Sequence, residues 1–230
     1  TEIELVEGIS ATSQNCWPSV EFDIGAINNF LKSFFPAGFY YKTFMWPKSF
    51  WYRVYEPFIR KAAGLGVGST EKDKERYEHK YEYCDLLVTG SGPSGLASAY
   101  AAAKSGAKVI LAEDKPRFGG SLLTDDVNID NLSGKQWADK IISELKEMPN
   151  VTLKNRSQVF GYYDHNMLVM FERTGDHLEK KSKYHPRQRL WYIRSKEVIL
   201  STGSIERPIV FGNNDTPGIF LASAAKEYMK

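Results

Sequence analysis

Residues 84–95 read CDLLVTGSGPSG, and this stretch decides the fold. Its apolar first half predicts a buried strand, and its glycines predict a tight turn after that strand. A helix-compatible run, residues 96–104, separates the turn from a second apolar run, KVILAE, at residues 108–113. Strand, glycine turn, helix and second strand in this order predict a nucleotide-binding βαβ unit.

The glycines of the turn have different tasks in such a unit. Gly90 makes the turn, Gly92 lets the backbone approach a pyrophosphate, and Gly95 lets the helix pack closely on the strand. The helix begins at Pro93, and Ser94 offers its N–H or hydroxyl to a phosphate at the positive end of the helix. We therefore expect the turn to bind the diphosphate of a dinucleotide.

Acidic residues follow the second strand. Glu113 stands where a carboxylate accepts hydrogen bonds from an adenosine ribose, and Asp114 is next to it. A carboxylate favours a free 2′-hydroxyl and repels a 2′-phosphate, so NAD or FAD is expected rather than NADP. Lys115 and Arg117 soften this exclusion, which keeps NADP as an alternative. A solvated pair of acids without a ligand is the other interpretation.

Later segments extend the predicted site. The loop with Gly120 and Ser121 is expected to fold over the ribose or the pyrophosphate, although a plain turn is an alternative. Val159 is expected to pass the adenine, with simple core packing as the alternative. Thr202 and Gly203 end a strongly apolar strand and resemble a second nucleotide fingerprint near the pyrophosphate.

The remaining pattern decides the fold class. Residues 134–148 have apolar positions at helical spacing, and five extended runs follow at 151–154, 158–163, 167–171, 190–193 and 197–203. The connection to the last strand is thus rich in β structure, whereas a simple dehydrogenase domain would cross with a helix. We predict an α/β FAD/NAD(P)-binding (Rossmann-like) fold, with a parallel sheet and an antiparallel β crossover.

Composition divides the chain into two zones. Residues 1–83 form an N-terminal zone and linker, and residues 84–230 form the dinucleotide-binding domain, incomplete at its C-terminus. Residues 30–58 contain thirteen aromatic residues among prolines and charges, which predicts an irregular segment rather than one helix or a membrane span. Its rings are expected to pack either within the chain or at a subunit or cofactor interface.

Charge and cysteine usage exclude several classes. The net charge is +2, so neither nucleic acid nor an anionic membrane is expected as a partner. Cys16 and Cys84 have no metal-binding or redox spacing, and no secretory signal is present, so a cytoplasmic location is expected. His165 is expected to lie in a hydrogen-bonded turn, with a general base as the alternative. The chain starts without methionine and is interpreted as a piece of a longer polypeptide.

Longer strings resemble a known family. They are residues 13–19 (SQNCWPS), 36–47 (PAGFYYKTFMWP), 55–64 (YEPFIRKAAG), 159–166 (VFGYYDHN), 186–191 (PRQRLW) and 202–208 (TGSIERP). Together they resemble the alpha subunit of heterotetrameric sarcosine oxidase, over essentially the whole chain.

The resemblance implies an enzyme that oxidises sarcosine to glycine, with formaldehyde or methylenetetrahydrofolate and hydrogen peroxide as the other products. It implies FAD in a beta subunit, FMN near the alpha–beta interface, gamma and delta subunits, and tetrahydrofolate in a C-terminal domain that this chain lacks. It also implies NAD in this chain, with the ligands Ser94, Glu113, Asp114, Lys115, Ser121 and Val159. No residue matches an amine-oxidising group, so no catalytic residue is predicted.

One departure and two alternatives remain. The family commonly has Asp and then Glu where this chain has Glu113 and Asp114, so the reach towards the ribose differs slightly. A related amine oxidoreductase, such as an opine or proline dehydrogenase or a cyanide-forming glycine oxidase, is one alternative. The other is a scaffold in which the dinucleotide is structural.

Overall fold

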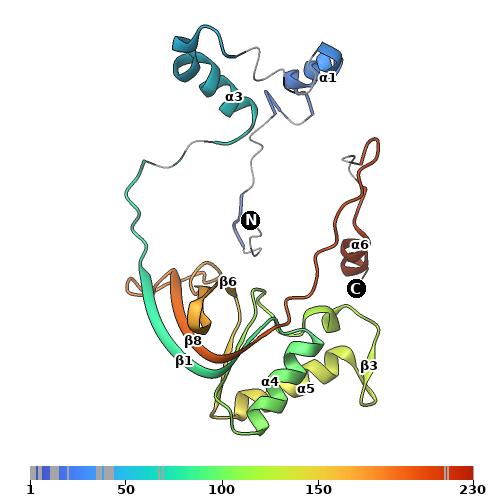
Figure 1. Cartoon of the computed structure of the whole chain (residues 1–230). Helices are drawn as coiled ribbons and strands as arrows, with labels where there is room; N and C mark the ends of the chain where they lie inside the picture. The colour runs from blue at the N-terminus through green and yellow to red at the C-terminus, as the bar shows by residue number, and fades with distance from the viewer. Residues whose placement is uncertain are drawn as a thin grey trace. The chain divides into compact units, whose positions relative to one another are not determined.

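The chain forms two compact units, Thr1–Asp73 and Lys74–Lys230, each considered by itself. The computed structural model (Figure 1) describes residues 4, 7–10, 16–19, 21–34, 38, 44–66, 68, 70–214, 216 and 218–229.

The described part of the first unit consists of short helices. Its elements are η1 (Ile24–Ile27), α1 (Asn28–Leu31), η2 (Lys32–Phe34), η3 (Lys48–Phe50), the π-helical η4 (Trp51–Tyr55) and α3 (Glu56–Ala62). Pro47 caps η3, so it begins a helical turn instead of interrupting one. Phe30 is 85% exposed and Trp46 is 81% exposed. Residues 35–37 and 39–43 of the aromatic zone lie outside the described residues.

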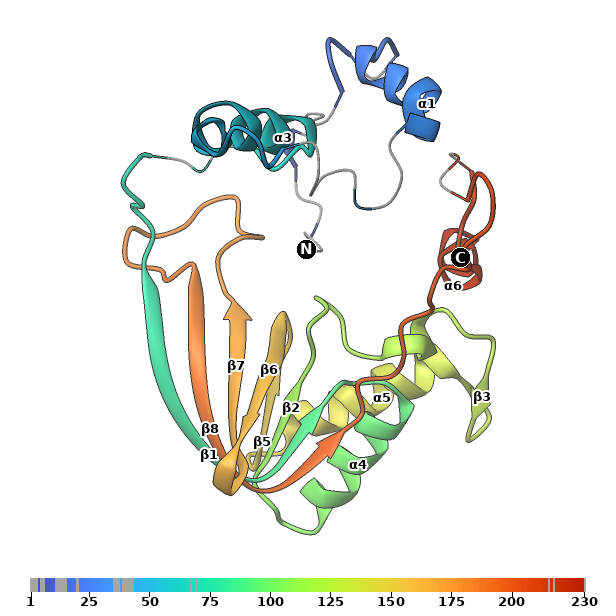
Figure 2. The same ribbon diagram turned by 45° about the horizontal axis from the view of Figure 1, so that its top comes forward.

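A six-stranded mixed sheet forms the frame of the second unit. Its order is β5-β2-β1-β8-β7-β6. The strands are β1 (Tyr77–Thr89), β2 (Val109–Ala112), β5 (Val151–Lys154), β6 (Ser157–Tyr163), β7 (Met167–Arg173) and β8 (Gln188–Leu200). Neighbours are parallel from β5 to β8 and antiparallel from β8 to β6, as Figure 2 shows. The predicted fold class is confirmed.

Two strands are longer than predicted. β1 begins at Tyr77, before the expected start at Cys84, and the separately predicted runs 190–193 and 197–203 are joined in β8. No glycine or proline interrupts residues 194–196, so the strand continues. The Ser195 hydroxyl accepts a hydrogen bond from the Cys84 thiol at 3.3 Å, and Lys196 pairs with Asp85 at 2.8 Å.

Two helices cover one face of the parallel part of the sheet. They are α4 (Pro93–Lys104) and α5 (Gly134–Glu147), and both lie on the same side of the strands in Figure 1. α4 buries Leu96, Ala99 and Ala103 at helical spacing, whereas Leu145 of α5 is fully buried. Burying a leucine side chain stabilises the fold by roughly 1.5–3 kcal/mol. The opposite face holds a second core cluster.

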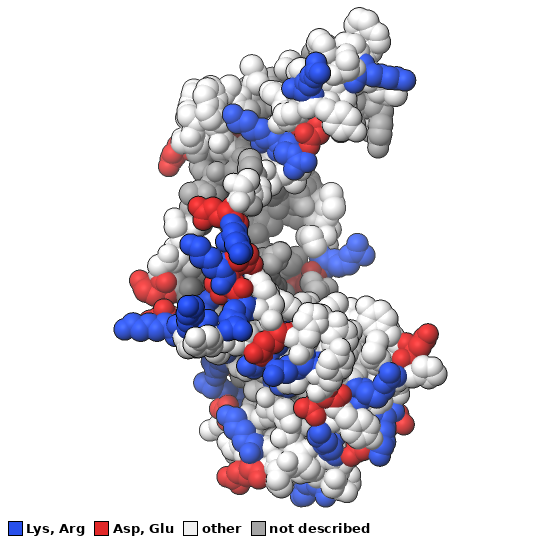
Figure 3. Space-filling view, turned by 90° about the vertical axis from the view of Figure 1, so that its left-hand side faces the viewer, with Lys and Arg blue, Asp and Glu red and all other residues white. Residues whose placement is uncertain are grey.

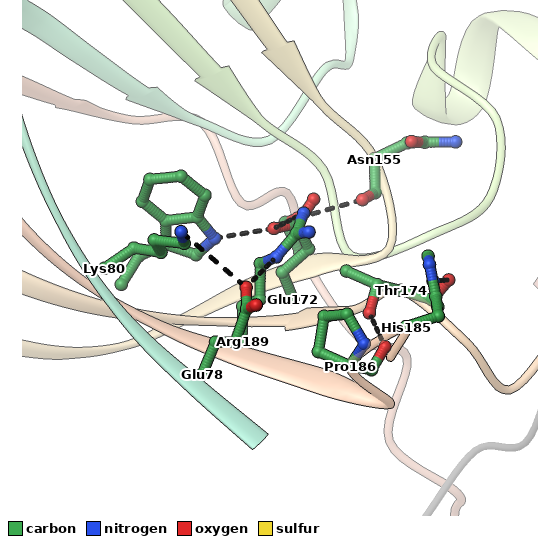
Figure 4. A network of polar contacts seen from close by, with 10 residues as sticks. Glu78, Lys80, Asn155, Glu172, Thr174, His185, Pro186 and Arg189 are labelled. Atoms are coloured by element: carbon green, nitrogen blue, oxygen red, sulfur yellow. Dashed lines mark hydrogen bonds and ion pairs between the residues drawn. The ribbon is translucent and has the colours of Figure 1, made fainter. Parts of the chain in front are cut away.

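Charged side chains join the early half of β1 to β8 and β7. Arg189 bonds to Glu78 at 2.9 Å and lies 3.8 Å from Glu172, and Lys80 lies 3.8 Å from Glu78 (Figure 4). Both signs of charge are intermingled on the face seen in Figure 3. The bond between Arg189 and Glu78 thus links the polar segment of β1 to β8.

The other elements are short connections. They are η5 (Gly120–Leu123), the hairpin of β3 (Asn128–Ile129) and β4 (Leu132–Ser133), η6 (Asp164–Asn166) and the terminal helix α6 (Ala222–Tyr228). No helix within the described residues has the length and apolarity needed to cross a membrane.

Candidate functional site

The glycine turn connects β1 to α4 at the carboxyl end of the parallel strands. The Gly90 N–H donates to Ala112 O at 2.8 Å, which ties the turn to the end of β2. Gly90 has a φ of +96°, and a Cβ there would lie 2.2 Å from Ser201 O. A Cβ on Gly95 would lie 1.9 Å from Gly90 O. Packing therefore requires both of these glycines.

Gly92 is different, because a Cβ there would meet nothing within 4 Å. Its φ of −64° is ordinary for any residue, so neither packing nor backbone strain explains a glycine at this position. Gly92 caps α4, and Pro93 and Ser94 are exposed in the first turn. Amide groups in a first turn have no partner inside their helix. The space beside Gly92 is therefore open, and a side chain would project into it; a diphosphate at this position stays a prediction.

Glu113 follows β2 directly and is only 7% exposed. Its Oε2 accepts hydrogen bonds from the Ser91 N–H at 2.9 Å and the Ser91 hydroxyl at 2.5 Å. Its Oε1 accepts one from the Lys115 N–H at 3.0 Å. The carboxylate predicted to recognise the ribose thus lies directly against the glycine turn.

The second glycine loop packs on the first. The Gly119 N–H donates to Ser91 Oγ at 3.0 Å and lies 3.2 Å from Ser91 O. A Cβ on Gly120 would be 2.9 Å from Gly92 Cα. Ser121 is exposed in η5, one residue further along. The predicted loop residue Gly120 is therefore beside the turn.

The loop that follows Glu113 is held in place through its backbone carbonyl groups. Lys115 is exposed, and its carbonyl accepts the Arg156 N–H at 3.0 Å. The Asp114 carbonyl accepts a hydrogen bond from the Arg173 guanidinium. These bonds hold the loop against the start of β6 and the end of β7.

Val159 lies on β6, an edge strand of the sheet, and packs against the second core cluster. The start of β6 reaches the acid, because the Ser157 N–H donates to Glu113 O at 2.8 Å. The side chain of Val159 thus has the core contact named as the alternative. A backbone contact of β6 with adenine stays a prediction.

The end of β8 is adjacent to the turn. Ser201 N donates to Thr89 O at 2.7 Å, and Thr202 Cα would lie 3.3 Å from a Cβ on Gly90. Thr202 and Gly203 are exposed, and Gly203 has a φ of +69°.

Ser91 is a site residue that the sequence pattern did not indicate. It is fully buried and contacts both the acid and the second glycine loop. The only signal was a hydroxyl residue between the first two glycines of the motif, where any residue satisfies the pattern.

The remaining polar groups of interest are a histidine outside the turn and a threonine beside it. His165 is exposed in η6 with a φ of 57°, and its carbonyl accepts from Arg194 at 2.7 Å. The buried Thr89 hydroxyl, just before the turn, has no hydrogen-bond partner among the described residues. The described residues contain no cluster of metal-ligating side chains.

Comparisons with known proteins agree with this geometry. A family model for FAD-dependent oxidoreductases matches residues 85–172, which include the glycine turn and Glu113. The sarcosine oxidase alpha subunit of Rhizobium meliloti (strain 1021) is 48% identical over 98% of this chain. The alpha subunit from Corynebacterium sp. (strain U-96) is 41% identical over 73% of the chain, which covers 18% of that protein. An opine oxidase subunit from Agrobacterium tumefaciens (strain Ach5) is 27% identical over 65% of the chain and 29% of its own length.

Among solved structures, L-proline dehydrogenase from P. horikoshii aligns with a TM-score of 0.52 and 23% identity. The alignment covers 71% of this chain and 31% of that one, and it shows a shared fold. This chain spans 23% of the length of the Rhizobium alpha subunit. The chain is therefore a homologue of sarcosine oxidase alpha subunits, and it carries the nucleotide-binding fold of FAD-dependent oxidoreductases.

Proposed function

We propose that this chain forms the NAD-binding part of the alpha subunit of a multi-subunit sarcosine oxidase. The observation that supports the proposal most directly is the open space beside Gly92, next to the first turn of α4. The diphosphate would lie there, with Ser94 and the loop at Gly120 and Ser121 around it. The Glu113 carboxylate would accept a hydrogen bond from the adenosine ribose.

The proposed reaction converts sarcosine, water and oxygen into glycine, formaldehyde and hydrogen peroxide, or passes the carbon to tetrahydrofolate. Flavins, FAD in a beta subunit and FMN near its contact with the alpha subunit, would supply the oxidation chemistry. Gamma and delta subunits would complete the enzyme. The alpha-subunit relatives support this reading. We also propose a cytoplasmic location, in keeping with Cys16 and Cys84, which form no disulfide.

Two other functions have specific support. The family model for FAD-dependent oxidoreductases favours FAD as the dinucleotide in this fold. The similarity to an opine oxidase favours another amine substrate. In both cases the chain's own residues bind and orient the dinucleotide. A scaffold in which the dinucleotide is structural is a further reading, because the Glu113 carboxylate is already engaged by hydrogen bonds from Ser91 and Lys115.

Nucleotide release tests the proposal. Acid-denatured wild-type protein should release NAD, identified by its mass and by an enzymatic assay. Gly92→Ala should lower the bound amount at least tenfold, because the new methyl group fills the space of the diphosphate, while the free energy of unfolding changes by about 1 kcal/mol or less. The matched control is Gly212→Ala, which also adds a methyl group with nothing within 4 Å. Release of FAD instead would overturn NAD, and full nucleotide content in Gly92→Ala would overturn the site.

A further inference from the structure

Ser91 connects the parts of the site. It stands between Gly90 and Gly92, and its side chain is fully buried. Its N–H and its hydroxyl both donate to one carboxylate oxygen, Glu113 Oε2, at 2.9 and 2.5 Å. A short hydrogen bond to a carboxylate is among the stronger hydrogen bonds in proteins. The orientation of the carboxylate therefore depends on Ser91.

Counting acceptor positions shows what remains for a ligand. An ionised carboxylate has about four lone-pair positions, two on each oxygen. Ser91 occupies both positions on Oε2, and the Lys115 N–H occupies one on Oε1. Counting the donors among the described residues, one acceptor position on Oε1 is left.

The same hydroxyl also holds the second loop. Ser91 Oγ accepts the Gly119 N–H at 3.0 Å while it donates to Glu113. The next residue, Gly120, is packed against Gly92, where a Cβ would lie 2.9 Å from Gly92 Cα. The Gly119 N–H also bonds to the Ser91 carbonyl oxygen at 3.2 Å, so the loop keeps this backbone bond when the hydroxyl is removed, and the main loss falls on the Glu113 carboxylate.

We propose that Ser91 is a positioning residue that makes Glu113 a single-acceptor reader of the ribose. With Oε2 filled, the carboxylate accepts a hydrogen bond from only one of the two adenosine-ribose hydroxyls, through Oε1. This inference rests on the proposed dinucleotide site and adds a specificity-determining residue to it.

Binding of NAD analogues tests the single contact. The wild-type protein, freed of nucleotide, is titrated with NAD and with two analogues that lack the 2′- or the 3′-hydroxyl of the adenosine ribose. One analogue should bind about tenfold more weakly than NAD, the loss typical of a hydrogen bond to a charged group, and the other within about threefold. Equal losses for both analogues would overturn the single-acceptor reading.

Variants test the role of Ser91. Ser91→Ala should weaken NAD about tenfold and leave the analogue without the recognised hydroxyl unchanged. In the Glu113→Gln background the same change should have no further effect, because Ser91 acts through that carboxylate. A purely structural role would weaken all three ligands equally and would add to Glu113→Gln.

Two controls keep the outcome readable. Ser91→Cys keeps the shape of the side chain with a somewhat larger atom and replaces a good donor with a weak one, so it decides the matter if Ser91→Ala does not fold. Ser143→Ala, exposed on α5, should leave all affinities unchanged. A wild-type protein that binds none of the ligands overturns the proposed dinucleotide site and this inference with it. Binding that Ser91 variants do not alter overturns only the inference.

Discussion

The Lys154 ammonium group lies 3.8 Å from the centre of the Trp191 ring. The same indole donates its N–H to Glu172 Oε2 at 2.6 Å. A lysine at the end of β5 thus lies over a ring of β8, where this aromatic ring and the nearby Glu172 carboxylate of β7 replace part of its hydration. The replacement is incomplete, because burial lowers the pKa of Lys154 below its ordinary value of 10.5.

The lowered pKa of Lys154 predicts that the free energy of unfolding depends on pH. Between the lowered pKa and 10.5, the native protein has released the Lys154 proton while the unfolded chain still holds it. The free energy of unfolding therefore rises with pH in that window. Lys154→Met lacks this contribution, so wild type should gain stability relative to the variant as pH rises towards 10.5. Urea unfolding of both proteins from pH 7 upwards measures this, and a difference that stays constant with pH would contradict it.

The polar half of β1 shows which part of the fold the sequence hid. Residues 77–83 read YEHKYEY and belong to the predicted N-terminal zone and linker, because they contain no aliphatic residue that would indicate a buried strand. The alternation of rings with charges was nevertheless a period-two signal. The rings of Tyr81 and Tyr192 stack 5.1 Å apart on one face, while Glu78 bonds to Arg189 on the other. Partners supplied by β8, distant in sequence, make this segment a strand.

The candidate site also contains residues that the sequence predicts and residues that it does not. The positions of Gly90, Gly95 and Glu113 could be predicted because the spacing of the motif reflects the geometry of a βαβ unit. The contacts of Ser91 did not, because they depend on a rotamer and on a loop that returns at Gly119. Val159 shows a similar limit, since sequence places it on β6 but does not say whether its side chain or its backbone faces a ligand.

Helix α5 depends on its N-terminal cap. The Ser133 hydroxyl accepts the Gln136 N–H at 3.3 Å, and the Gln136 side chain accepts the Ser133 N–H at 3.1 Å. Ser133→Ala should lower the free energy of unfolding by about 1 kcal/mol, because amides in the first turn lose their acceptor. Urea unfolding measures the loss, and bound nucleotide should stay unchanged. Ser143→Ala, exposed within the same helix, should shift stability by less than about 0.5 kcal/mol. Equal effects of the two variants would argue against the cap.

The bond between Lys108 and Glu82 gives an acid-side prediction. Lys108 Nζ lies 2.8 Å from Glu82 Oε1, and this hydrogen bond lowers the pKa of Glu82 below its ordinary 4.5. The stabilisation is complete above pH 4.5 and is lost as pH falls through the lowered pKa. Glu82→Gln should thus be less stable than wild type near pH 6 and equally stable once wild-type Glu82 is protonated.

Unfolding curves at several pH values, in low and high salt, measure this difference. Lys108→Met removes the partner of the same bond and should flatten the acid limb in the same way, since the Glu82 pKa then loses its main cause of lowering. High salt should reduce both effects, because the pair is partly exposed. A Lys108→Met protein whose acid limb matches wild type would show that another group controls it.

Thr89 gives the last prediction, because its buried hydroxyl has no hydrogen-bond partner among the described residues. Thr89 is the last residue of β1, directly before the glycine turn, and it is 9% exposed. Burying an unpaired hydroxyl costs about 1–3 kcal/mol. Thr89→Val keeps the shape and removes that cost, so the free energy of unfolding should rise by about 1 kcal/mol. Thr152→Val, half-buried on β5, is the comparison and should change stability by less. Urea unfolding and released nucleotide are measured on each protein. A Thr89→Val protein that is less stable or holds less nucleotide would argue that the hydroxyl serves a partner, because the replacement keeps the shape of the side chain and removes its hydrogen-bonding group.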